Sequence, residues 1–251
     1  MLFVLNELVK KMSIEFLLLF MVLALLAEII GTIGGFGSSL FFIPIASYFL
    51  DFHSVLGITA VFHVMSNLTK IAMFREGVDW KLIIRIGIPA TLFVIIGAFL
   101  SKYIETKWLE VSLAIFLLLL SVFLFLFNRI QLKPTVVNAV SGGVLSGFLA
   151  GLIGTGGAIR GIVLASFEMT PSMFIATSSF IDLSIDFSRG LVYYFNGFLH
   201  YHDLYLIPCL GVISVIGTYL GKKIVKRLTN EQFKKGVLIL VFITGLITLF
   251  K

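Results

Sequence analysis

The sequence predicts an all-helical integral membrane protein with about eight long transmembrane helices in two related halves. The 251 residues are 59% hydrophobic and 13% charged, and the mean hydropathy is +1.10. Soluble domains carry about 25% charged residues, so this chain has too few charges to cover a surface that faces water. A helix needs about 20 mostly apolar residues to cross a bilayer, and lipid favours helices because they pair their own backbone polar groups.

Apolar segments of spanning length occur along the whole chain. They cover residues 14–33, 55–74, 82–101, 109–127, 136–153, 172–195, 204–221 and 233–250. Two shorter apolar stretches, 38–50 and 158–167, follow the first and fifth segments, and glycines precede both. Neither stretch is long enough to cross as an unbroken helix. We therefore expect the first helix of each half to be broken at a glycine-rich stretch.

An internal repeat divides the chain into two halves. When residue n is placed beside residue n+120, several residues coincide without a change of register. The matches pair Gly31 with Gly151, Gly34 with Gly154, Gly37 with Gly157, Gly77 with Gly197, Gly97 with Gly217, Leu100 with Leu220 and Lys102 with Lys222. Matches at a fixed spacing indicate duplication. We predict one four-helix repeat over residues 1–128 and a second over 129–251, within a single membrane domain.

The positions of Lys and Arg favour inverted over parallel repeats. If each half crosses the membrane four times, the halves are parallel and the basic residues divide almost evenly between the two sides. If each half crosses an odd number of times, one side collects Arg75, Lys81, Arg85, Arg129, Lys133, Lys222, Lys223, Lys226, Arg227, Lys234 and Lys235. Cytoplasmic loops carry an excess of Lys and Arg, so we expect inverted repeats, a common plan among transporters.

Charge and cysteine content argue against other classes. The net charge of +6 is explained by basic residues in cytoplasmic loops, so nucleic acid is not expected as a partner. Cys209 is the single cysteine of the sequence, and no Cys/His spacing typical of a zinc site is present. We expect no cofactor, no metal site and no catalytic residue.

Two glycine-rich stretches at matching positions of the repeat are the first candidate binding site. Glycine allows backbone angles that other residues avoid, and a helix that restarts after a break presents free N–H groups and a positive dipole end that suit an anion. The alternative is close helix packing, which also fits the spacing of Gly143, Gly147 and Gly151. The candidate substrate-binding residues are Gly34, Gly35, Gly37, Ser38, Ser39, Gly154, Thr155, Gly156 and Gly157.

Arg160 and two serines extend this candidate site. Arg160 lies in the first turns of the second short helix, where its guanidinium could neutralise an anion. An ion pair with Glu168 or extension of the side chain to the membrane interface are the alternatives. Ser178 and Ser179 on the sixth segment are further candidates for substrate contact.

A polar stripe on the second segment corresponds to this serine region in the other half. The stripe consists of Thr59, His63, Asn67 and Lys70 at helical spacing. Such a stripe on an apolar helix predicts a wall that faces water or protein, and histidine can carry a proton near neutral pH. His63 and Asn67 are therefore candidates for coupling, with an interhelical hydrogen bond as the alternative role for His63.

Acidic residues lie within the predicted membrane segments. Asp182, Asp186 and Arg189 share one face of the sixth segment, and charged groups at the bilayer centre cost at least about 2.5–3.5 kcal/mol. They must therefore face protein or water. We predict that Asp182 and Asp186 couple transport to protons or sodium, with a structural pair between Asp186 and Arg189 as the alternative. Glu28, just before the first glycine break, is another intramembrane acid.

The chain resembles the sulfite exporter family of the TauE/SafE type. The resemblance rests on the glycine-rich break followed by a short apolar helix in both halves, most clearly Gly151–Gly161 with Pro171 and the Ser178–Ser179 helix. It covers nearly the whole chain, and it implies transport of small sulfur-containing or related organic anions. Arg160 and Asp182 have Leu40 and Phe62 as repeat counterparts, so the site is expected to be asymmetric.

The predicted function is secondary transport of a small anion, a sulfur oxyanion or organosulfonate, by alternating access of the two repeats. The alternative is a proton- or sodium-linked cation carrier that uses intramembrane Asp and Glu. An intramembrane aspartyl enzyme is disfavoured, because Asp182 and Asp186 on one helix are poorly placed to oppose each other across a substrate. The expected location is the cell membrane, with lipid and the anion as partners; association into a homo-oligomer is left open.

Overall fold

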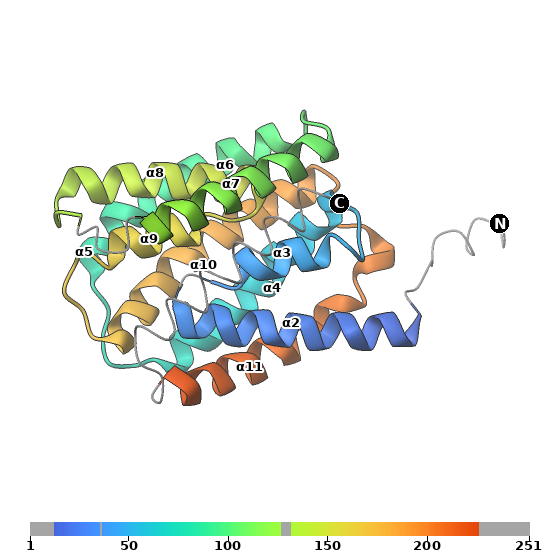
Figure 1. Cartoon of the computed structure of the whole chain (residues 1–251), viewed down its shortest axis with the longest axis horizontal. Helices are drawn as coiled ribbons and strands as arrows, with labels where there is room; N and C mark the ends of the chain where they lie inside the picture. The colour runs from blue at the N-terminus through green and yellow to red at the C-terminus, as the bar shows by residue number, and fades with distance from the viewer. Residues whose placement is uncertain (1–12, 36, 127–131, 226–251) are drawn as a thin grey trace.

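The computed structural model describes residues 13–35, 37–126 and 132–225, and throughout these ranges the regular structure is helical (Figure 1). Within these ranges six helices are long and apolar enough to cross a membrane: α2 (Ile14–Gly34), α4 (Phe52–Met73), the continuous run Trp80–Ser101, α7 (Thr106–Leu126), α8 (Val136–Ile153) and α11 (Leu206–Val225). The run Trp80–Ser101 consists of α5 (Trp80–Leu82), the π-helical turn η1 (Ile83–Gly87) and α6 (Ile88–Ser101).

The helix boundaries lie close to the expected segments. A further long helix, α10 (Pro171–Phe195), contains the acidic pair and Arg189, and so is less apolar than the other six. The expected segment 233–250, together with Phe36 and the basic residues Arg129, Lys226, Arg227, Lys234 and Lys235, lies outside the described residues. The predicted all-helical fold is therefore confirmed, and the predicted number of eight spanning helices is not.

Polar caps set where several helices begin. Asp51 precedes α4 and accepts the backbone N–H of His53 at 2.9 Å. The hydroxyl of Thr135 caps α8, and that of Thr170 caps α10 just before Pro171. These side chains replace the acceptors that the first N–H groups of a helix lack.

The first helix of each predicted half is followed by a short helix that runs back beside it. Gly35 ends α2 with a φ of 65°, in the left-handed region that glycine adopts easily. The following helix α3 (Ser39–Ala46) returns along α2, so the Phe20 and Phe42 rings lie 5.8 Å apart and the Phe20 and Phe49 rings 5.4 Å apart. We call residues 14–46 hairpin 1.

The second half repeats this arrangement. Gly154 ends α8 with a φ of 81°, and α9 (Gly157–Leu164) returns along α8 with Val163 against Gly142. We call residues 136–164 hairpin 2. The helices are thus interrupted at both glycine-rich stretches as expected, and the short helices turn back along their partners.

Other glycines serve close packing, as the alternative interpretation proposed. A Cβ added to Gly143 would meet the carbonyl oxygen of Ile86 in η1 at 2.5 Å, and one added to Gly147 would clash with the carbonyl of Ala90 in α6. Gly151 approaches Val94 and Gly97 in the same way. Small residues let helix backbones approach within a membrane, so this stripe holds α8 against α6.

The central helices α4 and α10 run antiparallel. At one end the Ser54 hydroxyl lies 2.6 Å from Nδ1 of His200, just after α10. At the other end the N–H of Asp79, just after α4, donates to the hydroxyl of Thr177 at 3.0 Å. The start of α4 therefore lies beside the end of α10, and the end of α4 beside the start of α10.

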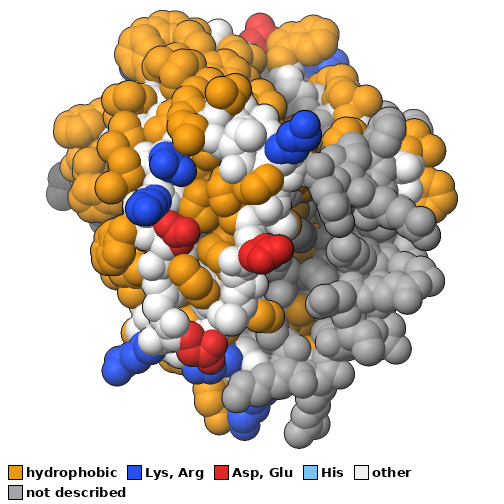
Figure 2. Space-filling view, turned by 90° about the vertical axis from the view of Figure 1, so that its left-hand side faces the viewer, with side chains coloured by type: hydrophobic (Ala, Val, Ile, Leu, Met, Phe, Trp, Pro, Cys, Tyr) orange, Lys and Arg blue, Asp and Glu red, His pale blue; other side chains and the backbone are white. Residues whose placement is uncertain are grey.

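Basic side chains gather at one end of the molecule. The end of α4, the run beginning at Trp80, the start of α8 and the end of α11 meet there, and Figure 2 shows Lys and Arg among acidic and apolar side chains on this face. The described basic residues at this end are Arg75, Lys81, Arg85, Lys133, Lys222 and Lys223, whereas Lys102 and Lys107 lie at the opposite end. We call the first of these the basic end.

Candidate functional site

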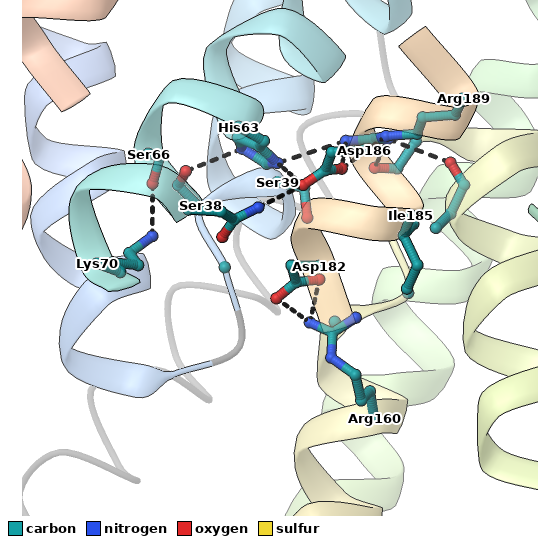
Figure 3. Close-up of a pocket in the computed structure, with 16 residues that line it drawn as sticks. Ser38, Ser39, His63, Ser66, Lys70, Arg160, Asp182, Ile185, Asp186 and Arg189 are labelled. Carbon is teal, nitrogen blue, oxygen red and sulfur yellow. Dashed lines mark hydrogen bonds and ion pairs between the residues drawn. The ribbon is translucent and has the colours of Figure 1, made fainter. Parts of the chain in front are cut away.

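A small polar cavity lies between the tips of the two hairpins and the middle of α4 and α10 (Figure 3). Its volume is about 20 Å³, enough for about one water molecule. The lining consists of Gly37, Ser38, Ser39, His63, Ser66, Asn67, Lys70, Ala150, Gly154, Gly156, Gly157, Arg160, Asp182, Ile185, Asp186 and Arg189. Both halves of the chain contribute, so the cavity forms only in the folded protein.

The hairpin tips touch each other and the opposite half. The Ser39 hydroxyl lies 3.1 Å from the Thr155 hydroxyl. The Ser178 hydroxyl of α10 donates to the carbonyl of Gly35 at 3.2 Å. Each tip is thus held by a helix or hairpin from the other half, which places the starts of α3 and α9 at the cavity.

Arg160, in the first turn of α9, pairs with Asp182 of α10. Its Nη2 lies 2.5 Å from both carboxylate oxygens of Asp182, and its Nε donates to the Ser178 hydroxyl at 3.4 Å. Arg160 is 1% exposed, so it does not extend to the membrane interface. Of the alternatives for this residue, an ion pair is present, with Asp182 as partner and not Glu168.

A second ion pair lies one turn along α10. Nε and Nη2 of Arg189 lie 2.8 and 2.7 Å from Oδ1 of Asp186, and the amide of Asn67 donates to Oδ2 at 2.7 Å. Nη1 of Arg189 also donates to the Gly154 carbonyl at 2.5 Å. Asp186 and Arg189 therefore form the structural pair that was the alternative to a coupling role, and Arg189 additionally satisfies the carbonyl that the glycine turn of hairpin 2 leaves free.

Glu28 forms the third buried cluster, beside the cavity and below the tip of hairpin 1. Lys70 of α4 lies 2.9 Å from its Oε1 and also donates to the Ser66 hydroxyl at 2.6 Å. Four hydroxyl groups donate to the carboxylate, those of Ser38 at 2.6 Å, Ser66 at 2.5 Å, Thr32 at 3.2 Å and Thr218 at 3.2 Å. Glu28 is completely buried, and this shell compensates the loss of water around its charge.

His63 connects two of these clusters. Its Nε2 lies 2.9 Å from the Ser38 hydroxyl, which donates to Glu28. Its Nδ1 lies 3.4 Å from Nη2 of Arg189 and 3.9 Å from Oδ2 of Asp186. The imidazole thus forms the interhelical contact that was one of its two predicted roles, and it lies between Ser38 and the pair of Asp186 and Arg189.

Comparison with known proteins identifies the family. The model of the sulfite exporter TauE/SafE family matches residues 20–248. This chain belongs to that family. A relative described as a probable membrane transporter protein, from Methanocaldococcus jannaschii, is 26% identical over 272 aligned residues that cover 96% of this chain and 98% of the relative. No solved structure matches the chain.

Membership of the TauE/SafE family confirms the resemblance found in the sequence. The protein is a multi-pass membrane transporter, in agreement with the six apolar helices of spanning length in the described residues.

Most of the residues predicted for this TauE/SafE transporter lie at the cavity. Those that line it are Gly37, Ser38, Ser39, Gly154, Gly156, Gly157, Arg160, Asp182, Asp186, His63 and Asn67. Gly35, Thr155 and Ser178 lie behind this lining and hold the hairpin tips. Gly34 is the last helical residue of α2, just before the Gly35 cap, and the hydroxyl of Ser179 donates to the carbonyl of Ile175 in its own helix.

Ser66 also lines the cavity and was not predicted from the sequence. Ser66 lies three residues after His63 and four before Lys70, so it continues the polar stripe of α4. That spacing was a usable signal. Lys70 was predicted for the stripe and Arg189 for a structural pair, and both also line the cavity.

Proposed function

We propose that the protein is a secondary transporter of a small anion, a sulfur oxyanion or an organosulfonate, that binds between the two hairpin tips. The observation that carries the proposal is the position of Arg160, a buried guanidinium in the first turn of α9 that faces the cavity. The N-termini of α3 and α9 meet at the same place, as the contact between Ser39 and Thr155 supports. Helix N-termini and arginine together recognise oxyanions.

Anion binding requires that a carboxylate release a cation. The three cations around the cavity, Lys70, Arg160 and Arg189, each contact a carboxylate. Asp182 is the most exposed of these acids, with 15% of its side chain accessible against 6% for Asp186 and 0% for Glu28. We infer that the substrate takes the place of Asp182 beside Arg160. The Asp182 carboxylate is the most exposed of the three, so its release from the ion pair leaves the least buried unpaired charge.

The balance of charge in the site supports coupling to a cation. Three carboxylates face three basic side chains, so with neutral His63 the formal charges cancel. An anion that enters leaves an uncompensated negative charge in a medium where that is costly. A proton or a sodium ion taken up at Asp182, Asp186 or His63 restores the balance, and Asn67 keeps Asp186 oriented toward the cavity.

The arrangement of helices supports alternating access by inverted repeats in the cell membrane. Hairpins 1 and 2 have the same construction, and the equivalent helices α4 and α10 run antiparallel. The cavity lies where the halves meet, as in other transporters of this plan. We assign the basic end to the cytoplasm by the positive-inside rule. Transport then consists of movement of residues 1–128 against residues 129–251, which opens the cavity to each side in turn.

Uptake into proteoliposomes tests this function. Radiolabelled sulfite and thiosulfate are offered with and without an imposed pH or sodium gradient. We expect saturable uptake that a gradient accelerates. Arg160→Gln is expected to weaken apparent affinity by about tenfold or more, since a charged hydrogen bond contributes about 1.5–3 kcal/mol. The exposed Arg85→Gln is the matched control, because Arg85 lies away from the cavity.

A double variant separates binding from stability. Arg160→Gln leaves the carboxylate of Asp182 without its ion pair, so Arg160→Gln with Asp182→Asn is measured beside it. Weak anion affinity in both variants supports the site. Folded protein that carries neither anion, or an Arg160→Gln variant with unchanged affinity, rejects it.

The shell around Glu28 favours a second candidate, a sodium- or proton-linked cation carrier. The carboxylate and the four hydroxyl oxygens around it are the hard oxygen ligands that small metal cations prefer, and such a cation would take the place of the Lys70 ammonium beside Glu28. A flux or current that follows sodium and is indifferent to the anion would favour this candidate over anion transport.

A further inference from the structure

A group of three side chains with metal-binding chemistry lies far from the cavity, in the connection between α10 and α11. His200, His202 and Asp203 each place a ligand atom within 4.8 Å of the other two. Nε2 of His202 lies 3.3 Å from Oδ2 of Asp203, and Nδ1 of His200 lies 3.9 Å from the same oxygen. This connection is at the end of the molecule opposite the basic end.

The carboxylate at the centre of this group lacks a hydrogen-bond donor. Asp203 is 4% exposed, and its Oδ2 atom is buried without a hydrogen-bond partner among the described residues. A buried carboxylate oxygen left in this way costs free energy unless a cation compensates it. The two imidazoles that approach it are about two-fifths exposed, so the group is open to ions from solution on one side and buried on the other.

We propose that His200, His202 and Asp203 bind a divalent transition-metal ion, with zinc as the best match. Two imidazole nitrogens and one carboxylate oxygen are a ligand set that zinc accepts. Ligand atoms at about 2.0–2.1 Å from a tetrahedral zinc ion are about 3.3 Å apart. The distance from Asp203 to His202 has this value, and that from Asp203 to His200 is 3.9 Å. Both histidines are about two-fifths exposed, so water could supply the fourth ligand.

A metal ion here would hold the connection between α10 and α11. The Ser54 hydroxyl in the first turn of α4 lies 2.6 Å from Nδ1 of His200, so a metal ion on this nitrogen would take the place of that hydrogen bond. Because α10 lines the transport cavity at its middle, the bound ion would stabilise the folded transporter from one end without contacting the anion. This inference does not depend on which solute is carried.

Zinc binding to the purified full chain tests the proposal. The protein is prepared in detergent with a tag that contains no histidine, stripped with a chelator, and titrated with ZnCl2 by calorimetry, and bound zinc is counted by elemental mass spectrometry. We expect about one zinc ion per chain and an increase in the melting temperature, since a ligand that binds only the folded state stabilises it. With Co2+ as probe, absorption bands typical of tetrahedral coordination are expected.

Variants locate the site. His202→Gln and Asp203→Asn should each weaken zinc affinity by about tenfold or more, and both should lose the thermal shift. His202 is largely at the surface, so its replacement leaves the fold intact. Glu76→Gln, an exposed acid at the basic end, is the control and should bind zinc as the unaltered chain does. Zinc bound equally by both site variants, or binding that requires millimolar zinc, overturns the proposal.

Discussion

The Ser39 hydroxyl lies 3.1 Å from the Thr155 hydroxyl, although 116 residues separate them in the chain. These residues lie at the tips of hairpins 1 and 2, so the contact marks the place where the two halves meet. The proposed mechanism requires that the halves move against each other at this place. The contact can therefore be used to arrest the movement.

A disulfide between the tips should stop transport. We expect Ser39→Cys with Thr155→Cys, in a chain whose exposed Cys209 is replaced by serine, to cross-link under mild oxidation, because the two side chains are within the reach of a disulfide. Anion uptake should then fall to background and return after reduction. Each single cysteine variant is the control and should be insensitive to oxidant. Full transport by the cross-linked double variant would show that the tips do not separate during the cycle.

Removal of either partner of the Glu28–Lys70 pair should destabilise the protein. Both side chains are buried and lie 2.9 Å apart, so Glu28→Gln or Lys70→Met leaves an uncompensated charge that costs about 3–5 kcal/mol. The double variant should recover part of that loss, since it leaves neither charge. Thermal unfolding of the four proteins in detergent gives the coupling free energy. Additive losses in the double variant would show that the pair does not act as a unit.

Replacement of Asp182 by asparagine should strengthen anion binding and slow turnover. The carboxylate occupies Arg160 in the structure, so its neutralisation frees the guanidinium for the substrate. We expect the dissociation constant for the transported anion to decrease by about tenfold, and the maximal uptake rate to fall because release becomes slower. Binding calorimetry and proteoliposome uptake measure the two effects. An unchanged or weaker affinity would contradict competition between substrate and Asp182.

The glycine stripe of α8 should tolerate no side chain. A Cβ at Gly147 would overlap the backbone of Ala90 in α6, so Gly147→Ala is expected to destabilise the protein by about 1–3 kcal/mol. Gly190→Ala in α10 is the matched control, because its Cβ would lie 3.6 Å from that of Ala60, an ordinary contact. Thermal unfolding should place the control at or above the unaltered chain. Equal stability of the two variants would show that α6 and α8 can separate at no cost.

Repeat-equivalent loops should face opposite sides of the membrane. Gly77 and Gly197 are matched by the repeat, and the exposed residues Glu76 and Tyr201 lie in the same two connections. In inverted repeats, cysteine at position 76 is labelled by an impermeant thiol reagent from the cytoplasm and cysteine at position 201 from outside. Each cysteine is introduced singly into a chain in which Cys209 is replaced, and labelling is compared between intact cells and inverted membrane vesicles. Labelling of both positions from one side would establish parallel repeats.

The sequence alone was sufficient for the fold class and for the place where the chain turns. Composition excludes a water-facing surface, so long apolar segments have to be helices in lipid. Glycine clusters at matching positions of the repeat indicated both helix interruptions, at Gly35 and Gly154, because few other residues accept a positive φ. Most residues of the candidate site could also be predicted from the sequence, for a related reason. Polar and charged residues are costly inside a membrane, so those present in the apolar segments point to protein or water.

Only the tertiary structure decided which charges meet. Helical spacing placed Asp186 near Arg189 in the same helix, a local relationship that periodicity can reveal. The pairing of Arg160 with Asp182, and that of Glu28 with Lys70, depends on how α9 packs on α10 and α2 on α4, and no residue spacing encodes those contacts. The return of α3 and α9 along their hairpins was undetermined for the same reason. A glycine permits a turn in many directions, and packing against the neighbouring helices selects one.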